Sequence, residues 1–138
     1  MAMSADELRA RTRQFALDVI AVCLQLGNGD LARLVRPQLL RAASGVASNH
    51  RACAWSRSRR EFCSRLGVVV EETDESELWL DVLQVFSCGE AEVVTRRRGE
   101  AIELRAIFAK SRSTALANLA KQRELRRQKR RRLEIRTA

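Results

Sequence analysis

Apolar residues recur along the first part of the chain in alternating steps of four and three. They are Leu8, Thr12, Phe15, Val19, Val22 and Leu26. This spacing places them on one face of an amphipathic helix of the kind that packs in a bundle. Gly27-Asn28-Gly29 predicts the end of this helix, and Asp30 is predicted as the N-cap of the next.

A second helix is indicated by a similar apolar face. Its members are Val35, Leu39, Ala42, Val46 and Cys53. Small residues from Ala42 to Ser48 lie at its middle, so a neighbouring helix is expected to approach closely there. Pro37 leaves two alternatives open, because the helix either begins near this residue or begins near Asp30 and is kinked by it.

Two further helices follow. Ser58-Arg59-Arg60-Glu61 matches a capping box, with Ser58 and Glu61 as the reciprocal cap, and predicts a helix from Ser58 to about Ser87. Gly89 marks a turn, and the fourth helix is clearest at Ala101, Leu104, Phe108, Ala115 and Leu119. Beyond Lys121 the chain has little apolar face to hold a helix, so we expect fraying there.

The predicted fold is therefore all-α, an up-down-up-down antiparallel four-helix bundle in residues 1–120 with a basic C-terminal tail in residues 121–138. The first and third helices run parallel in this topology, and each contains a segment that is apolar on nearly every side. The surplus apolar residues, predicted to form an oligomer interface, are Leu17, Ile20, Leu24 and Trp79. The alternative is that neighbouring helices cover them within one subunit.

The composition narrows the possible functions. The 138 residues carry 26 Lys and Arg against 17 Asp and Glu, with one histidine, His50. The four cysteines show no C-x-x-C spacing, and we interpret them as buried thiols of a cytoplasmic protein. No secretory leader or membrane span is expected. No catalytic site, metal or cofactor is predicted, because no base lies beside a nucleophile and the pair His50 and Cys53 has no second ligand pair in register.

Charge is distributed unevenly along the chain. Residues 61–92 hold nine acids and a single base, Arg65, whereas residues 121–138 hold nine bases and two acids. The candidate nucleic-acid-binding residues are Arg123, Arg126, Arg127, Lys129, Arg130, Arg131 and Arg132, with a smaller cluster at Arg96, Arg97 and Arg98. Because no aromatic residue lies among them, we expect sequence-tolerant contact with the phosphates of RNA or DNA. The alternative is a solvated end that keeps the protein soluble.

Polar residues on the second and third helices form another candidate cluster. Asn49 and Arg51 are predicted to meet Glu72 and Glu75 in a polar layer that fixes the helix register. Two alternatives stay open. The cluster could be a ligand site, or the acids could pair with arginines elsewhere on the bundle, namely Arg41, Arg59, Arg60 and Arg65.

The helices also contain motifs in a recognisable order. The central block comprises residues 38–52, which include Asn49-His50-Arg51, then Ser58-Arg59-Arg60-Glu61-Phe62, residues 66–69, Glu72-Thr73-Asp74-Glu75-Ser76 and residues 79–83. The second block comprises residues 100–104, 106–108, Ser111 and 114–115. From Ala5 to Ala117 the chain resembles the bacterial four-helix-bundle proteins whose founding members are encoded in intervening sequences of large-subunit (23S) ribosomal RNA genes. The basic tail lies outside this resemblance.

The resemblance implies a ring-shaped homo-oligomer, a pentamer, and no enzymatic activity. A related group serves as accessory subunits of diversity-generating retroelements, which implies a reverse transcriptase or a ribosomal component as partner. We therefore expect a non-enzymatic, nucleic-acid-binding accessory protein. The alternative is a protein-interaction scaffold that docks through its apolar surface.

Overall fold

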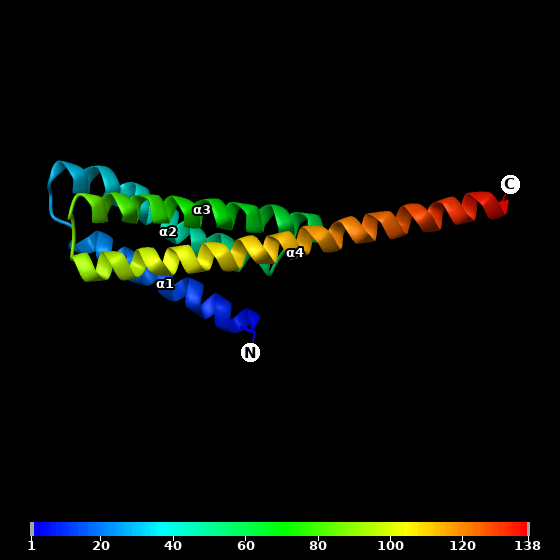
Figure 1. The fold of residues 1–138 in the computed structure, drawn as a ribbon, viewed down its shortest axis with the longest axis horizontal. Coiled ribbons are helices and arrows are strands. Elements are labelled where there is room, and N and C mark those ends of the chain that lie inside the picture. Colours follow the sequence, from blue (N-terminus) through cyan, green and yellow to red (C-terminus); the bar gives the residue numbers. More distant parts are fainter. Residues whose placement is uncertain (1, 138) are drawn as a thin grey trace.

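The computed structural model describes residues 2–137, which form four α-helices and no β-strand. The helices are α1 (Ala5–Gln25), α2 (Asp30–Cys53), α3 (Arg59–Val85) and α4 (Ala91–Thr137). Each helix runs antiparallel to the one before it, and α4 continues far beyond the other three (Figure 1). The predicted all-α, up-down-up-down four-helix bundle is confirmed.

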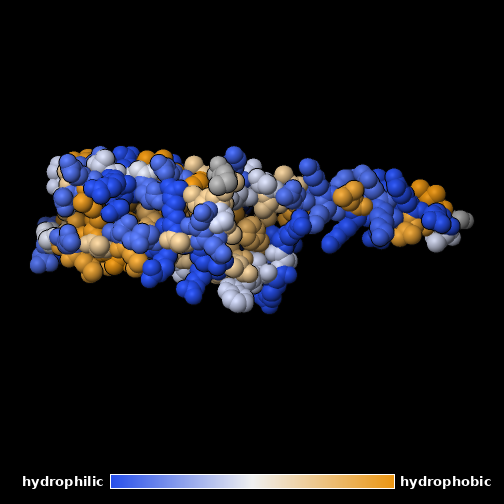
Figure 2. Space-filling model, turned by 90° about the horizontal axis from the view of Figure 1, so that it is seen from below, coloured by the Kyte–Doolittle hydropathy of each residue, from blue (hydrophilic) through white to orange (hydrophobic). Residues whose placement is uncertain are grey.

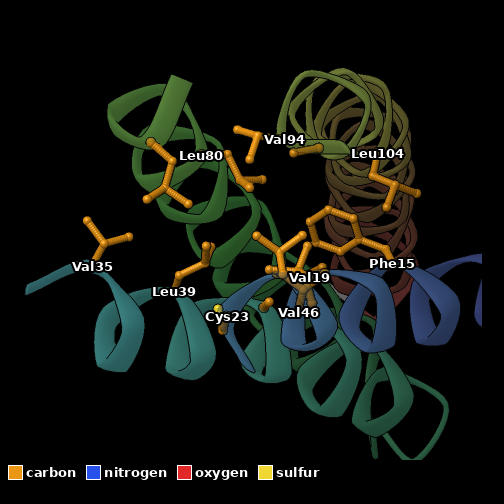
Figure 3. Close-up of a cluster of buried hydrophobic side chains, with 14 of the residues drawn as sticks. Phe15, Val19, Cys23, Val35, Leu39, Val46, Leu80, Val94 and Leu104 are labelled. Atoms are coloured by element: carbon orange, nitrogen blue, oxygen red, sulfur yellow. The ribbon is translucent and has the colours of Figure 1, made fainter. Parts of the chain in front are cut away.

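The core lies where the four helices face one another. α2 packs against α1 and α3, α3 also packs against α4, and the boundary between α1 and α4 is the least extensive. Figure 3 shows side chains from all four helices converging, among them Phe15, Leu39, Leu80 and Leu104, each at most 1% exposed. The predicted apolar face of the first helix is buried at Thr12, Phe15, Val19, Val22 and Leu26.

The start of α2 differs from the sequence prediction. Gly29, not Asp30, is the N-cap, and Asp30 is the first helical residue, where its carboxylate lies at the positive end of the helix dipole. Pro37 lies inside the helix, so α2 begins at Asp30 rather than near the proline. Arg36 donates to the carbonyl oxygens of Leu26 and Gly27, both at 2.6 Å, and so holds the preceding loop.

The predicted cap of α3 is present in a modified form. The Ser58 hydroxyl accepts from the Glu61 backbone N–H at 3.0 Å, as expected. The Glu61 carboxylate, however, accepts from the backbone N–H of Arg57 at 2.8 Å, one residue before the cap. A full capping box instead begins α1, where Ser4 and Glu7 bond reciprocally. The Ser-x-x-Glu spacing at residues 4–7 was a sufficient signal that the sequence analysis did not use.

The α3–α4 turn confirms the role predicted for Gly89. This residue has φ of 87°, a left-handed conformation that glycine adopts without strain. A Cβ atom at this position would also lie 3.2 Å from side-chain atoms of Leu26 and Val94. The chain can therefore reverse closely against the end of the bundle.

Candidate nucleic-acid interface

The C-terminal part of α4 forms one straight, projecting helix (Figure 1). We call residues 121–137 of this helix the basic arm. The last α4 side chain buried in the bundle is Phe108, and every residue of the arm after Gln122 is exposed. The helix crosses the predicted domain boundary at residue 121 without a break.

The expectation that this segment frays is wrong for the structure, in which the helix persists to Thr137. The arm continues a helix that the bundle has already nucleated, so the unfavourable first turn does not have to form separately. Arg, Lys, Gln, Glu and Leu, which dominate the arm, are good helix formers. Cations in its last turns also interact favourably with the negative end of the helix dipole.

The candidate phosphate-binding side chains of the arm lie in solvent. Arg123, Arg126, Arg127, Lys129, Arg130, Arg131 and Arg132 are all exposed. Within the described residues, one ion pair involves this set, between Arg130 and Glu134 at 2.9 Å, and both of its side chains are more than half exposed. Such a pair is worth little in water. The arm therefore presents its cations almost without internal compensation.

The smaller cluster, Arg96 to Arg98, is placed differently. The Arg97 guanidinium lies 3.1 Å from the Asp18 carboxylate of α1. Arg98 lies 3.3 Å from Asp81 of α3 and also donates to the Gln84 side chain at 3.0 Å. Arg96 is exposed. Two of these three cations thus hold α4 against its neighbours.

Glu72 and Glu75 contact Arg41 rather than Asn49 or Arg51. One guanidinium nitrogen of Arg41 lies 3.5 Å from Glu72 and the other bonds Glu75. Gly45 leaves room for this arrangement, because a Cβ atom there would lie 3.0 Å from the Glu72 carboxyl carbon. Burial nevertheless raises the pKa of Glu72, against the opposing effect of Arg41.

The predicted register is wrong by about two helical turns, because α2 and α3 pair residues at similar distances from their short connecting loop. Asn49 and Arg51 lie close to that loop, whereas Glu72 lies far along α3. At the level of Arg51 it is Arg65 that crosses to α2, donating to the Ala52 carbonyl oxygen at 3.0 Å. Arg51 itself is exposed.

The four predicted interface residues divide into two pairs. Leu17 and Leu24 on α1 are 41% and 73% exposed. Ile20 is half-buried, and Trp79 is half-buried and packed against the core. Other large apolar side chains are exposed at the same end of the bundle as Leu24, namely Leu34, Leu78, Val85 and Phe86. Figure 2 shows apolar surface gathered over this end, away from the arm.

Two concave features were not predicted. A groove of about 530 Å³ lies between α1 and α2, with small and apolar side chains such as Ala10, Leu17 and Ala47 in its lining and Arg9 and Arg51 among the cations beside them. The sequence pattern of either helix alone does not predict this groove, because the groove depends on how α1 and α2 diverge. In Figure 1 the first turns of α1 turn away from α4.

A second cavity, of about 420 Å³, lies beneath those first turns, and His50 lines it beside Phe62 and Phe108. The ring centroids of His50 and Phe108 are 5.0 Å apart. The Nδ1 atom of His50 is buried without a hydrogen-bond partner. Burial, and secondarily the charge of Arg9, lowers the pKa of this imidazole.

The remaining chemistry-bearing residues form no site within the described part of the chain. Cys23, Cys53, Cys63 and Cys88 are free thiols, and the first three are buried. Burial raises the pKa of Cys23 to about 11, which makes its thiolate scarce at neutral pH. Residues 2–137 contain no group of three or more potential metal ligands. None of the four helices has the length and apolarity needed to cross a membrane.

Comparison with known proteins bears on the fold. The chain matches no protein-family model, and no curated protein matches it significantly. Among solved structures it is similar to a protein of unknown function from the S23 ribosomal protein family of Bacteroides thetaiotaomicron, with a TM-score of 0.73 and 20% sequence identity. The match covers 80% of this chain and 99% of that one, so one-fifth of this chain has no counterpart there. The fold agrees with the predicted resemblance to ribosomal intervening-sequence proteins, and the link to retroelements stays a prediction. In fold, then, this chain is similar to a member of the S23 ribosomal protein family.

Proposed function

We propose that this protein is a non-enzymatic accessory protein that binds the phosphate backbone of nucleic acids through the basic arm. The observation that carries the proposal is a helix of exposed cations that projects from the bundle (Figure 1). The bundle serves as the scaffold that holds one end of this helix. Arg96 lies outside the arm and is available as an additional phosphate contact.

Electrostatics supports a polyanion as the ligand. The arm holds nine cations and two carboxylates, a net charge of +7 over its length. Cations so close together repel one another, and a polyanion relieves this repulsion while it releases its own condensed counterions. Guanidinium groups also bind phosphate in a bidentate manner, which suits the excess of arginine in the arm.

The experiment compares the full chain with a truncation that ends at Gln122, in mobility-shift titrations over a range of salt concentrations. If the arm engages about five phosphates, the logarithm of the affinity falls with the logarithm of the salt concentration at a slope of roughly −4 to −5 on duplex DNA. The truncation should lose most of the affinity and most of this slope. Thermal unfolding of both proteins serves as the control, since the arm contributes no buried side chain after Gln122. Equal retention of nucleic acid by both proteins would contradict the proposal.

A second candidate function is a protein-interaction scaffold, and the exposed apolar end of the bundle favours it. Leu24, Val85 and Phe86 are each at least 66% exposed, and large contiguous apolar surface typically marks a protein interface. A second copy of the chain, in a ring such as the pentamer that the resemblance implies, is one occupant of this surface. A reverse transcriptase or a ribosomal component is the other.

Light scattering on the purified chain tests this candidate. We expect an oligomer at micromolar concentration that Leu24→Glu dissociates, because a charge would be buried in the interface. Leu125→Glu is the matched control, since Leu125 is 64% exposed and lies in the arm, away from this end. A strict monomer that captures no reverse transcriptase or ribosomal component would count against the scaffold function.

A further inference from the structure

The cations of the basic arm lie on opposite sides of one helix. Arg123, Arg127 and Arg131 are spaced four residues apart and share a face. Arg132 follows Arg123 by nine residues, or two and a half turns at 3.6 residues per turn, and so lies on the opposite face together with Lys129 and Arg136. All six side chains are exposed and none forms an ion pair within the described residues.

This arrangement discriminates between kinds of anionic ligand. A flat surface, such as a lipid headgroup layer or an acidic protein face, can contact only one side of a straight helix. The opposite three cations would then remain in solvent and contribute little. A groove with anionic walls on both sides contacts both sets at once.

The dimensions of the helix fit one such groove. An α-helix with its side chains is about 10–12 Å across, and the major groove of B-form DNA is about 12 Å wide with phosphates along both edges. The fifteen residues from 123 to 137 span roughly 22 Å at 1.5 Å per residue, which corresponds to several base pairs. The major groove of A-form RNA is deep and too narrow for such entry.

The chemistry of the arm also disfavours a single strand. Proteins that bind single-stranded nucleic acids without sequence preference combine a charged groove with aromatic side chains on which the bases stack. The arm contains no Phe, Trp or Tyr. Its uncharged residues include Leu125 and Gln128, and neither offers a stacking surface.

We infer that the basic arm enters the major groove of double-stranded DNA and contacts phosphates of both strands. The inference rests on the proposed function and adds the class of nucleic acid. Residues 113–120, which precede the basic arm on α4, separate the bundle from the duplex by roughly 12 Å of helix. The bundle can therefore lie beside the DNA while the arm occupies the groove.

The first test compares a short DNA duplex, an RNA duplex of the same sequence and the single DNA strand as probes in anisotropy titrations at one salt concentration. We expect the full chain to bind the DNA duplex at least tenfold more tightly than either other probe. Equal affinity for all three would overturn the groove inference while leaving phosphate binding intact. Absence of binding to any probe would instead overturn the proposed function.

The second test separates the two faces of the arm. One variant carries Arg123→Gln, Arg127→Gln and Arg131→Gln, and the other carries Lys129→Gln, Arg132→Gln and Arg136→Gln. Each should lose a similar amount of affinity for the DNA duplex, and each should reduce the salt slope by roughly 2, about half of the total, if the phosphate contacts are shared between the two faces. A loss confined to one variant would indicate a one-sided surface and overturn the inference.

The third test asks whether the helix itself is required. Gln128→Pro preserves every cation but removes a backbone donor and breaks the helix near the middle of the arm. We expect it to lose about tenfold in affinity for the DNA duplex, whereas the matched control Gln128→Ala binds as the natural sequence does. If the proline variant retains full affinity, the arm acts as a flexible polycation and the groove inference fails.

Discussion

Arg97, Arg98 and Arg105 in the first half of α4 contact carboxylates of neighbouring helices, whereas the arginines of the basic arm extend into solvent. Arg98 lies 3.3 Å from Asp81, and Arg105 bonds both Asp74 and Glu77. Arg131, on the same helix, contacts no acid among the described residues. Arginine thus holds the bundle together in the first half of α4 and stays available to a ligand in the basic arm.

The difference arises from the neighbours of each half of α4, not from α4 itself. α3 carries seven of the 17 acids of the chain, more than any other helix, and runs beside the first half of α4. Among residues 2–137, no other helix runs beside the arm (Figure 1). A cation without a partner in the fold is therefore the more informative one for function, and variants placed in each half of α4 test this difference.

The largest contrast is expected from a pair of apolar truncations. Phe108→Ala removes a ring that is 0% exposed in the first half of α4, and we expect a loss of about 3–5 kcal/mol in the free energy of unfolding. Leu125→Ala in the arm removes a side chain that is 64% exposed and should change it by less than about 0.5 kcal/mol. Urea unfolding followed by far-UV circular dichroism measures both. A large destabilisation by Leu125→Ala would show that the arm packs against something in solution.

A smaller contrast is expected from a pair of arginine truncations. Arg105→Ala leaves Glu77, whose side chain is only 15% exposed, with Arg98 as its remaining cation at 3.9 Å. We expect a loss of about 1 kcal/mol in the free energy of unfolding. Arg131→Ala should leave this free energy unchanged.

The effects of Arg105→Ala and Arg131→Ala on DNA binding should be the reverse of their effects on stability. Arg131→Ala should reduce the salt slope of binding by roughly 0.9, the contribution of one phosphate contact. Arg105→Ala should leave the slope unchanged, because its guanidinium is already paired with two acids of α3. If both variants reduced the slope equally, ion pairing within the bundle would not decide which arginines bind.

How much of this contrast the sequence could predict depends on the kind of interaction. Periodicity located all four helices, because burial of a helix face is repeated every three to four residues. The partners of Arg97 and Arg98 could not be predicted from their cluster, since Asp18 and Asp81 come from distant parts of the chain. In the sequence, Arg96 to Arg98 and the arm are both simply arginine clusters.

The two wrong predictions, the register of α2 against α3 and the fraying of the arm, have separate physical causes. The pairing of Arg41 with Glu72 follows from the short α2–α3 loop, which brings together residues equally far from it, and counting outward from the loop would have found it. The helical order of the arm could not be predicted from an apolar face, because the arm has no such face. It follows from continuity with a helix that Leu104 and Phe108 already anchor in the core.

The smallest contrast is expected from acidification, which should affect the bundle and spare the arm. His50 packs against Phe108, and burial lowers its pKa below the ordinary value of 6.5. As the pH falls below about 6.5, the unfolded chain gains a proton that the folded imidazole resists, so the free energy of unfolding decreases. His50 is the one histidine of the chain and lies outside the arm, so its protonation should leave phosphate binding by the arm unchanged.

Urea unfolding of the natural chain and of His50→Gln, at about pH 7.5 and about pH 5.5, measures the effect. Glu72, whose pKa is raised by burial, acts in the opposite direction, because the folded chain binds its proton more readily. That contribution is common to both proteins and cancels in their difference, which isolates His50. The change should be modest, since the ring is only half-buried and faces a cavity that water can enter as it becomes charged. If His50→Gln retains the full pH dependence, the imidazole is solvated in the folded chain and the first turns of α1 do not close over it.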